Sequence, residues 1–186
     1  MRLSHTILLV PVLAAFGCAT TESAAPPAAA APAPARPSVP ADIEAPATAT
    51  LALQLAAKGT QNYRCQTAPS GTAEWKLVAP EADLSKTPGG DVVGKHGAGP
   101  SWTLNDGSSA KGDSASAKKA PSPEAGSILW LLMPATASSQ AGGLHGVTLA
   151  QRVDTHGGAA PATGCDAASV GAETKVPYTA TYVFYR

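Results

Sequence analysis

The stretch that decides the fold is Pro177-Tyr178-Thr179-Ala180-Thr181-Tyr182-Val183-Phe184-Tyr185. Successive side chains of a β-strand point to opposite faces. One face of this stretch would therefore carry Tyr178, Ala180, Tyr182 and Phe184. Aromatic and β-branched residues that alternate in this way are typical of a strand with one face in a core. We therefore expect a β-strand here.

Shorter stretches of the same kind recur along the chain, between turns rich in glycine and proline. They are residues 61–65, 73–78, 101–104, 108–117, 128–133 and 147–154. Asn105-Asp106-Gly107 predicts a hairpin turn. Many short strands with frequent turns favour an all-β fold, an antiparallel β-sandwich or barrel with long Gly/Pro-rich loops.

Two local assignments differ from this pattern. Leu51 to Ala57 is compatible with a helix or with the first strand. Pro80-Glu81-Ala82-Asp83-Leu84 predicts one short helical turn. Neither alters the expectation of one β domain over residues 51–186, a length that suits a single core.

The N-terminal residues resemble a bacterial lipoprotein signal peptide. A basic start at Arg2 precedes an apolar run that ends at Gly17-Cys18. This run is too short to cross a bilayer in a mature protein and has the layout of a removable signal, residues 1–17. Cys18 would then carry the acyl chains of a lipid anchor. The alternative is ordinary signal cleavage near Cys18, which would release a soluble secreted protein.

A spacer is expected at residues 18–50. From Ala19 to Thr50 the chain has 32 residues, of which 13 are alanine and 7 are proline. Proline removes backbone donors, and little here is large and apolar, so this composition predicts a disordered tether. Because residue 19 is alanine, the anchor resembles one sorted to the outer membrane, with the domain on its periplasmic face.

The three cysteines divide into one anchor and one pair. If Cys18 carries lipid, Cys65 and Cys165 remain, and an oxidising compartment favours a disulfide between them. The alternative is two free buried thiols. No Cys-x-x-Cys occurs, so neither a redox centre nor a zinc knuckle is suggested.

Charge narrows the range of partners. The chain has 13 basic and 13 acidic residues, a formal net charge of zero. Without a basic stripe, nucleic acid is not an expected partner. The expected partners are the membrane, through the lipid anchor, and a small ligand or another envelope component. The sequence suggests no cofactor and no metal.

Five polar or aromatic residues are candidates for a ligand site: His96, Trp102, Asp106, Asp154 and His156. Asp154 and His156 are two apart, so on a strand both would face one side. With His96 and Asp106 they could supply a general base or metal ligands. The alternative is structural: histidine bonded to a turn, and aspartate capping a strand end.

No nucleophile accompanies these residues. Ser114 lacks the pattern of a nucleophile elbow, and no His-Glu-x-x-His or phosphate-binding loop occurs. The large rings are open to two interpretations, as core or as one wall of a ligand pocket. Trp102, beside Pro100 and a glycine-rich turn, is the ring expected nearest a pocket.

The ordered run of motifs resembles a known family, the domain of unknown function 3455, found in bacteria and fungi. The matching stretches are residues 59–65, 75–82, 96–102, 106–108, 130–132, 151–158 and 177–182. The resemblance spans residues 51–185. The family has no established activity, so it implies boundaries and no mechanism.

Three functions remain open from the sequence. The favoured one is an envelope lipoprotein whose β domain binds a ligand or partner without catalysis. The second is a hydrolase or metal-dependent enzyme that uses His96, Asp106, Asp154 and His156. The third is a purely structural lipoprotein.

Overall fold

The computed structural model describes residues 35–186. The predicted signal peptide (1–17), Cys18 and the predicted spacer up to residue 34 lie outside the described residues. Over residues 35–186 the chain forms one 3-10 turn, η1 (Ala41–Ile43), and nine strands. The strands are β1 (Leu51–Thr67), β2 (Ala73–Ser85), β3 (Val92–Gly97), β4 (Ser101–Leu104), β5 (Ser109–Gly112), β6 (Lys118–Ala120), β7 (Trp130–Ala137), β8 (Leu149–Gly157) and β9 (Glu173–Tyr185). In this part of the chain no helix has the length and apolarity needed to cross a membrane.

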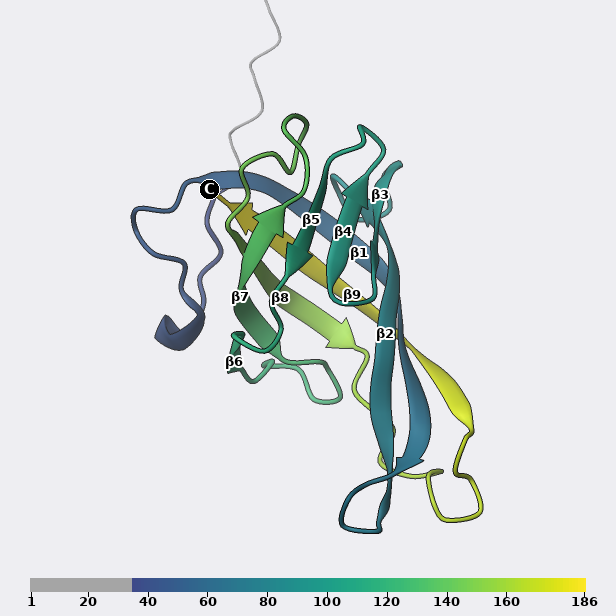
Figure 1. Cartoon of the computed structure of the whole chain (residues 1–186). Helices are drawn as coiled ribbons and strands as arrows, with labels where there is room; N and C mark the ends of the chain where they lie inside the picture. The colour runs from purple at the N-terminus through teal and green to yellow at the C-terminus, as the bar shows by residue number, and fades with distance from the viewer. Residues whose placement is uncertain (1–34) are drawn as a thin grey trace, which may run out of the picture. The chain divides into compact units, whose positions relative to one another are not determined.

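The strands form one antiparallel sheet that closes on itself (Figure 1). Their order is β5-β4-β3-β2-β1-β9-β8-β7-β6. A further pairing of β5 with β7, from Ala110↔Ala137 to Gly112↔Ala135, joins the two sides of the sheet. The all-β prediction is confirmed, and this closure makes the domain a barrel rather than a sandwich.

The interior of the barrel holds the main core. On β9 the predicted alternation is confirmed, because the face of Tyr178, Ala180, Tyr182 and Phe184 is buried there. Leu55 of β1 lies opposite Tyr182 and packs in the same core. Each large side chain buried in this way contributes on the order of 2–3 kcal/mol of hydrophobic free energy.

The outer face of the sheet is covered on one side by residues 35–50, which we call the N-terminal strap. Ile43 of η1 is buried against Val183, Val153 and Leu132, on the outside of β9, β8 and β7. Gln151 Nε2 donates to the carbonyl of Ile43 (2.7 Å). The strap thus explains why β9 is apolar on its second face too.

This packing corrects the expected spacer boundary. The sequence predicts a disordered tether up to residue 50, but residues 35–50 pack on the sheet. Arg36 donates to the carbonyls of Ala45 and Pro46, and its guanidinium lies 5.3 Å from the centre of the Tyr185 ring. Hydrogen bonds in both directions between Thr50 and Arg186 complete the attachment. Few but well-placed apolar and cationic side chains therefore order a segment rich in alanine and proline.

Two local expectations are resolved by β1 and β2. Leu51 to Ala57 is strand, not helix. The helical turn predicted at Pro80–Leu84 is wrong, because these residues continue β2 opposite residues 57–61 of β1. Pro80 adjoins a bulge, where the register shifts between Asn62 and Tyr63. A proline is tolerated in a strand beside such an irregularity.

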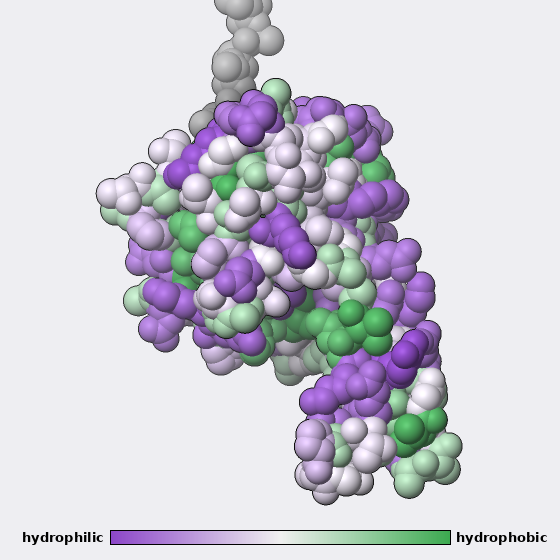
Figure 2. All heavy atoms as spheres, viewed as in Figure 1, coloured by the Kyte–Doolittle hydropathy of each residue, from purple (hydrophilic) through white to green (hydrophobic). Residues whose placement is uncertain are grey.

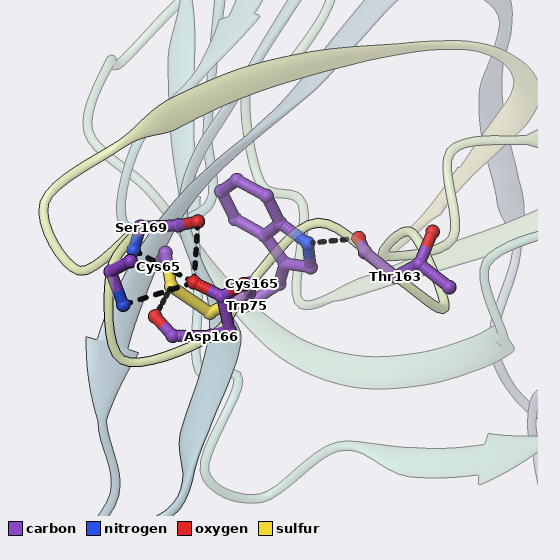
Figure 3. Close-up of a disulfide and its surroundings, with 7 residues drawn as sticks. Cys65, Trp75, Thr163, Cys165, Asp166 and Ser169 are labelled. Carbon is purple, nitrogen blue, oxygen red and sulfur yellow. Dashed lines mark hydrogen bonds between the residues drawn. A yellow bond between two sulfur atoms is a disulfide. The ribbon is translucent and has the colours of Figure 1, made fainter.

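The hairpin β1–β2 extends past the body of the barrel with the start of β9 (Figure 1). A disulfide between Cys65 and Cys165, with 5.4 Å between their Cα atoms, ties the end of β1 to the loop before β9, so the predicted bond is confirmed. Figure 3 shows Trp75 beside it, with Nε1 donating to the carbonyl of Thr163 (2.9 Å). Asp166 Oδ1 accepts from the backbone and the hydroxyl of Ser169 (2.9 and 2.8 Å), which folds this loop onto the disulfide.

Candidate functional site

An open cavity of about 680 Å³ enters one end of the barrel. Its walls come from β1, β2, β3, β4, β6, β7, β8 and β9 and from the loops at that end. Much of the lining is apolar and includes Pro80, Pro100, Ile128, Leu131 and Met133. Cavities of this size and character hold small organic ligands in many proteins.

The mouth of the cavity is also apolar. Leu77 and Val78 of β2 are 53% and 52% exposed, and Leu129, before β7, is 45% exposed. Figure 2 shows a compact hydrophobic patch on this face, beside the part of β2 that leads to the projecting hairpin. Exposed apolar side chains gathered at the rim of a cavity are typical of a binding site.

Three rings form the aromatic wall of the cavity. His96 of β3 stacks on Trp102 of β4, with 5.1 Å between ring centroids and 16° between planes. Tyr182 lies 4.7 Å from His96 and meets Trp102 edge-on at 5.4 Å. Gly112 of β5 makes room for the indole, because a Cβ there would lie 3.1 Å from Trp102 Cη2 and closer still to Met133.

His96 is a neutral histidine inside this wall. Its side chain is almost fully buried, and Nδ1 lies 2.9 Å from the carbonyl of Ser101. A carbonyl can only accept, so Nδ1 carries the proton and Nε2 keeps a lone pair. Burial lowers the pKa of His96 to about 4; the Ser101 hydrogen bond opposes this shift and the charge of Arg152 adds to it.

Arg152 of β8 brings a positive charge into the barrel. It lies opposite Leu131 of β7 and Tyr182 of β9, whose side chains belong to the interior core, so it faces the same side. Its Nε and Nη2 donate to the carbonyl of Leu129 (3.1 and 2.8 Å). Among residues 35–186 no carboxylate forms an ion pair with it.

Arg152 acts electrostatically on the rings around it. Burial raises the pKa of Tyr182 and of Tyr63, and in both cases the positive charge of Arg152 acts in the opposite direction. Since the same charge also lowers the pKa of His96, the guanidinium is close enough to all three rings to influence them.

Three buried groups of residues that line the cavity make no hydrogen bond of normal geometry within the described part of the chain: Gln61 Nε2, Trp102 Nε1 and the Tyr182 hydroxyl. Tyr182 still has polar neighbours, because Arg152 and Tyr178 lie close enough to oppose the rise in its pKa that burial causes. We call the three groups the unpaired donors, because each can donate a hydrogen bond. Their side chains are at most 1% exposed. A buried polar group left unpaired costs roughly 1–3 kcal/mol, so unpaired groups at a cavity point to a solute or to water.

Asp106 does not belong to this cavity. It follows β4, whereas Gly99 and Pro100 of the cavity precede β4, so Asp106 lies toward the other end of the barrel. Its Oδ1 accepts from the backbone and hydroxyl of Ser108 (2.8 and 2.6 Å), and Oδ2 accepts from Gly143 N (2.8 Å). These hydrogen bonds lower the pKa of Asp106, and the bond from the Ser108 hydroxyl has the largest effect. They tie the β4–β5 turn to the loop after β7.

Asp154 and His156 lie on the outside of the barrel. Both are exposed and share a side, as their spacing predicts, while Val153 and Thr155 are buried. Asp154 has φ of +48° at an irregularity of the β8–β9 pairing, between Val153 and His156. His156 Nδ1 forms a hydrogen bond with the Glu124 carboxylate. Their arrangement is that of a bulge and a surface pair.

Of the five predicted site residues, only His96 and Trp102 line the cavity. His96, Asp106 and the neighbouring Asp154 and His156 lie in three separate places, each with its own partners, so the structure does not bring the four residues of the enzyme hypothesis together. Within residues 35–186, no group of three or more histidine, cysteine or acidic side chains is arranged to hold a metal ion.

Sequence reasoning missed Arg152 and Gln61, whereas Tyr63 is among the large rings considered for a pocket wall. Alternation in residues 147–154 did not indicate which row faces the core, and in the structure Leu149 and Val153 lie outward under the strap whereas Ala150 and Arg152 face the interior. The only signal was indirect: Arg152 lies within the motif at residues 151–158 that the family resemblance uses.

The fold and cavity define an all-β domain with an open interior at one end. A family model, described as protein of unknown function (DUF3455), matches residues 46–186. The chain therefore belongs to this family, and the resemblance found from the sequence is confirmed. No curated protein and no solved structure matches the chain.

Proposed function

We propose that the β domain binds a small, largely apolar ligand in the cavity of the barrel, without catalysing a reaction. The observation that carries this proposal is the open cavity of about 680 Å³ with three unpaired donors on its wall. A protein interior is normally close-packed and its buried polar groups are paired. At this cavity the interior is open and three buried polar groups lack a hydrogen bond of normal geometry.

The test uses N-phenyl-1-naphthylamine, a neutral probe whose fluorescence rises in apolar surroundings. All binding measurements use the full chain with Cys18→Ser, because acyl chains would themselves take up the probe. We expect the probe to bind this protein in detergent-free buffer with a single saturable site. Ala117→Trp would fill the mouth, since Ala117 lines the cavity from the loop after β5, and should weaken binding at least about tenfold. Ala115→Trp, at an exposed residue of the same loop, is the matched control and should bind as the wild type does.

Absence of saturable binding would contradict the proposal, and so would equal binding by Ala117→Trp and the wild type. Circular dichroism of both variants shows whether the substitutions leave the fold intact.

We further propose that the domain is held at the cell envelope by a lipid on Cys18, at the periplasmic face of the outer membrane. The support is the sequence alone: Arg2, the apolar run up to Gly17-Cys18, and the alanine- and proline-rich residues that follow. Cys18→Ser should move the protein out of the membrane fraction and prevent labelling with radioactive palmitate. Unchanged membrane attachment of this variant would contradict the anchor.

A further inference from the structure

The ligand's chemistry can be inferred from the groups that the cavity leaves unpaired. Gln61 Nε2, Trp102 Nε1 and the Tyr182 hydroxyl are all able to donate, and none completes a hydrogen bond of normal geometry among residues 35–186. The Nη1 of Arg152 adds a charged donor, since only Nε and Nη2 reach the carbonyl of Leu129. A ligand that completes this set must bring acceptor oxygens.

The charge of Arg152 also favours a ligand with acceptor oxygens. Arg152 places a positive charge in a cavity wall made mostly of apolar and aromatic side chains, and within the described residues no acidic side chain neutralises it. His96, which is part of the aromatic wall, is neutral at pH 7 and adds no second positive charge beside Arg152. A charge in such surroundings is stabilised by an anion that can approach it.

We propose that the ligand is an organic carboxylate with an apolar body, whose carboxylate binds Arg152 together with the unpaired donors. A guanidinium matches the two oxygens of a carboxylate in a planar, bidentate pair. The apolar body then lies along Leu131 and Met133 toward the exposed Leu77 and Leu129 at the mouth. This inference rests on the proposed function and adds the ligand's charge and polarity.

The test compares two molecules that differ in the polar end only. Decanoate and 1-decanol are titrated into the full chain with N-phenyl-1-naphthylamine bound, and the concentration that displaces half of the probe is measured. We expect decanoate to act at a concentration at least about tenfold lower than 1-decanol, because its carboxylate pairs with a partly desolvated cation.

Substitutions then locate the anion. Arg152→Met should raise the midpoint for decanoate to that for 1-decanol and leave the midpoint for 1-decanol unchanged, and Arg152→Lys should restore part of the difference. Arg64→Met is the matched control, because Arg64 is an exposed arginine of β1 paired with Glu173 (2.5 Å), and it should behave as the wild type. If Arg152→Met does not fold, the double variant Gln61→Leu/Tyr182→Phe replaces it, with an expected loss of about fivefold or more for decanoate alone.

Equal midpoints for decanoate and 1-decanol in the wild type would overturn this inference while leaving the proposed function intact, since the neutral probe still binds. A folded Arg152→Met variant with wild-type decanoate binding would also overturn it. So would loss of the decanoate preference in Lys119→Met alone, because Lys119 lies at the cavity on the β6 side and is exposed. Failure of the probe itself to bind would count against the proposed function instead.

Discussion

The polar side chains around Asp106 and those around Arg152 lie toward opposite ends of the same barrel, and they differ in how their hydrogen bonds are completed. At the Asp106 end, both carboxylate oxygens accept from Ser108 and Gly143, and the Ser108 hydroxyl accepts in turn from Leu144 N (3.1 Å). At the Arg152 end, three donors stay unpaired within residues 35–186.

This difference in hydrogen bonding distinguishes polar groups that stabilise a turn from polar groups that are available to a ligand. A cluster whose members satisfy one another stabilises a turn and needs nothing from outside. A set of buried donors beside an open cavity costs stability until an acceptor arrives. From sequence both ends offered plausible site residues, and only the completeness of the hydrogen bonds distinguishes them. The comparison predicts that substitutions at the first end affect stability and that those at the second affect binding.

The largest expected effect concerns the disulfide that holds the extended hairpin beside the cavity. Replacing both Cys65 and Cys165 by serine frees a loop with a sequence separation of 100 residues. Loop-closure entropy then predicts a loss of about 4 to 5 kcal/mol in the free energy of unfolding. Urea denaturation of the variant and the wild type measures it. A loss below about 1 kcal/mol would show that the cross-link does not stabilise this end.

The second effect is a pH dependence from His96. In the unfolded chain a histidine ionises near its usual pKa of about 6.5, whereas in the folded protein burial lowers the pKa of His96 to about 4. The unfolded state therefore binds more protons between these values. The free energy of unfolding should fall as the pH drops from about 6.5 to about 4, by up to about 3 kcal/mol from this group.

The difference in the free energy of unfolding between the wild type and His96→Gln isolates the contribution of His96. Denaturant titrations at pH 7.5, 5.5 and 4.5 should show a gap in stability that narrows as the pH falls. A gap independent of pH would contradict a neutral, buried His96.

The third and smaller expected effect is on thermal stability, and it tests the Asp106 end, where the polar groups hydrogen-bond to one another. Asp106→Ala removes the acceptor of Ser108 and Gly143 and should lower the melting temperature by roughly 5 °C. Binding of the neutral probe and of decanoate should stay as in the wild type. Asp91→Ala, at another exposed aspartate in a turn, serves as the control and should leave the melting temperature unchanged. Weaker decanoate binding by Asp106→Ala would contradict the prediction that the Asp106 end affects stability alone.

The smallest expected change in stability comes from Tyr182→Phe. The Tyr182 hydroxyl completes no hydrogen bond of normal geometry in residues 35–186, so its removal should not lower the free energy of unfolding and is expected to raise it by about 1 kcal/mol. The same substitution should weaken decanoate binding several-fold, because the anion loses a donor. Thermal denaturation and probe displacement on one sample measure both. A large loss of stability would mean that the hydroxyl has a structural role.

The fold was largely predictable from local pattern. Alternation in residues 177–185 and the turn at Asn105-Asp106-Gly107 identify β9 and the β4–β5 hairpin. Closure of the sheet could not be predicted, because it depends on β5 meeting β7, a pairing of short strands without a distinctive sequence. The strap was missed for a related reason: Ile43 and Arg36 are isolated contacts within an alanine- and proline-rich stretch, and composition outweighs them.

The candidate site was predictable only in part. Trp102 was expected nearest a pocket because of the glycine-rich turn before it, and it does line the cavity with His96. Arg152 and Gln61 gave no local signal, since their importance arises from the inward side of strands far apart in sequence. Asp154 was misleading for a physical reason: an aspartate tolerates the positive φ of a bulge, and this structural use resembles a site residue in sequence.

The central claim is that Arg152 and the unpaired donors bind a carboxylate inside the barrel. Carbon-13 NMR of decanoate labelled at its carboxyl carbon tests it most directly. With the full chain, the account predicts a separate bound signal that stays in the ionised form at a lower pH than the free ligand, and that disappears with Arg152→Met. A bound signal that titrates as the free ligand does, or that persists unchanged in a folded Arg152→Met variant, would contradict the account.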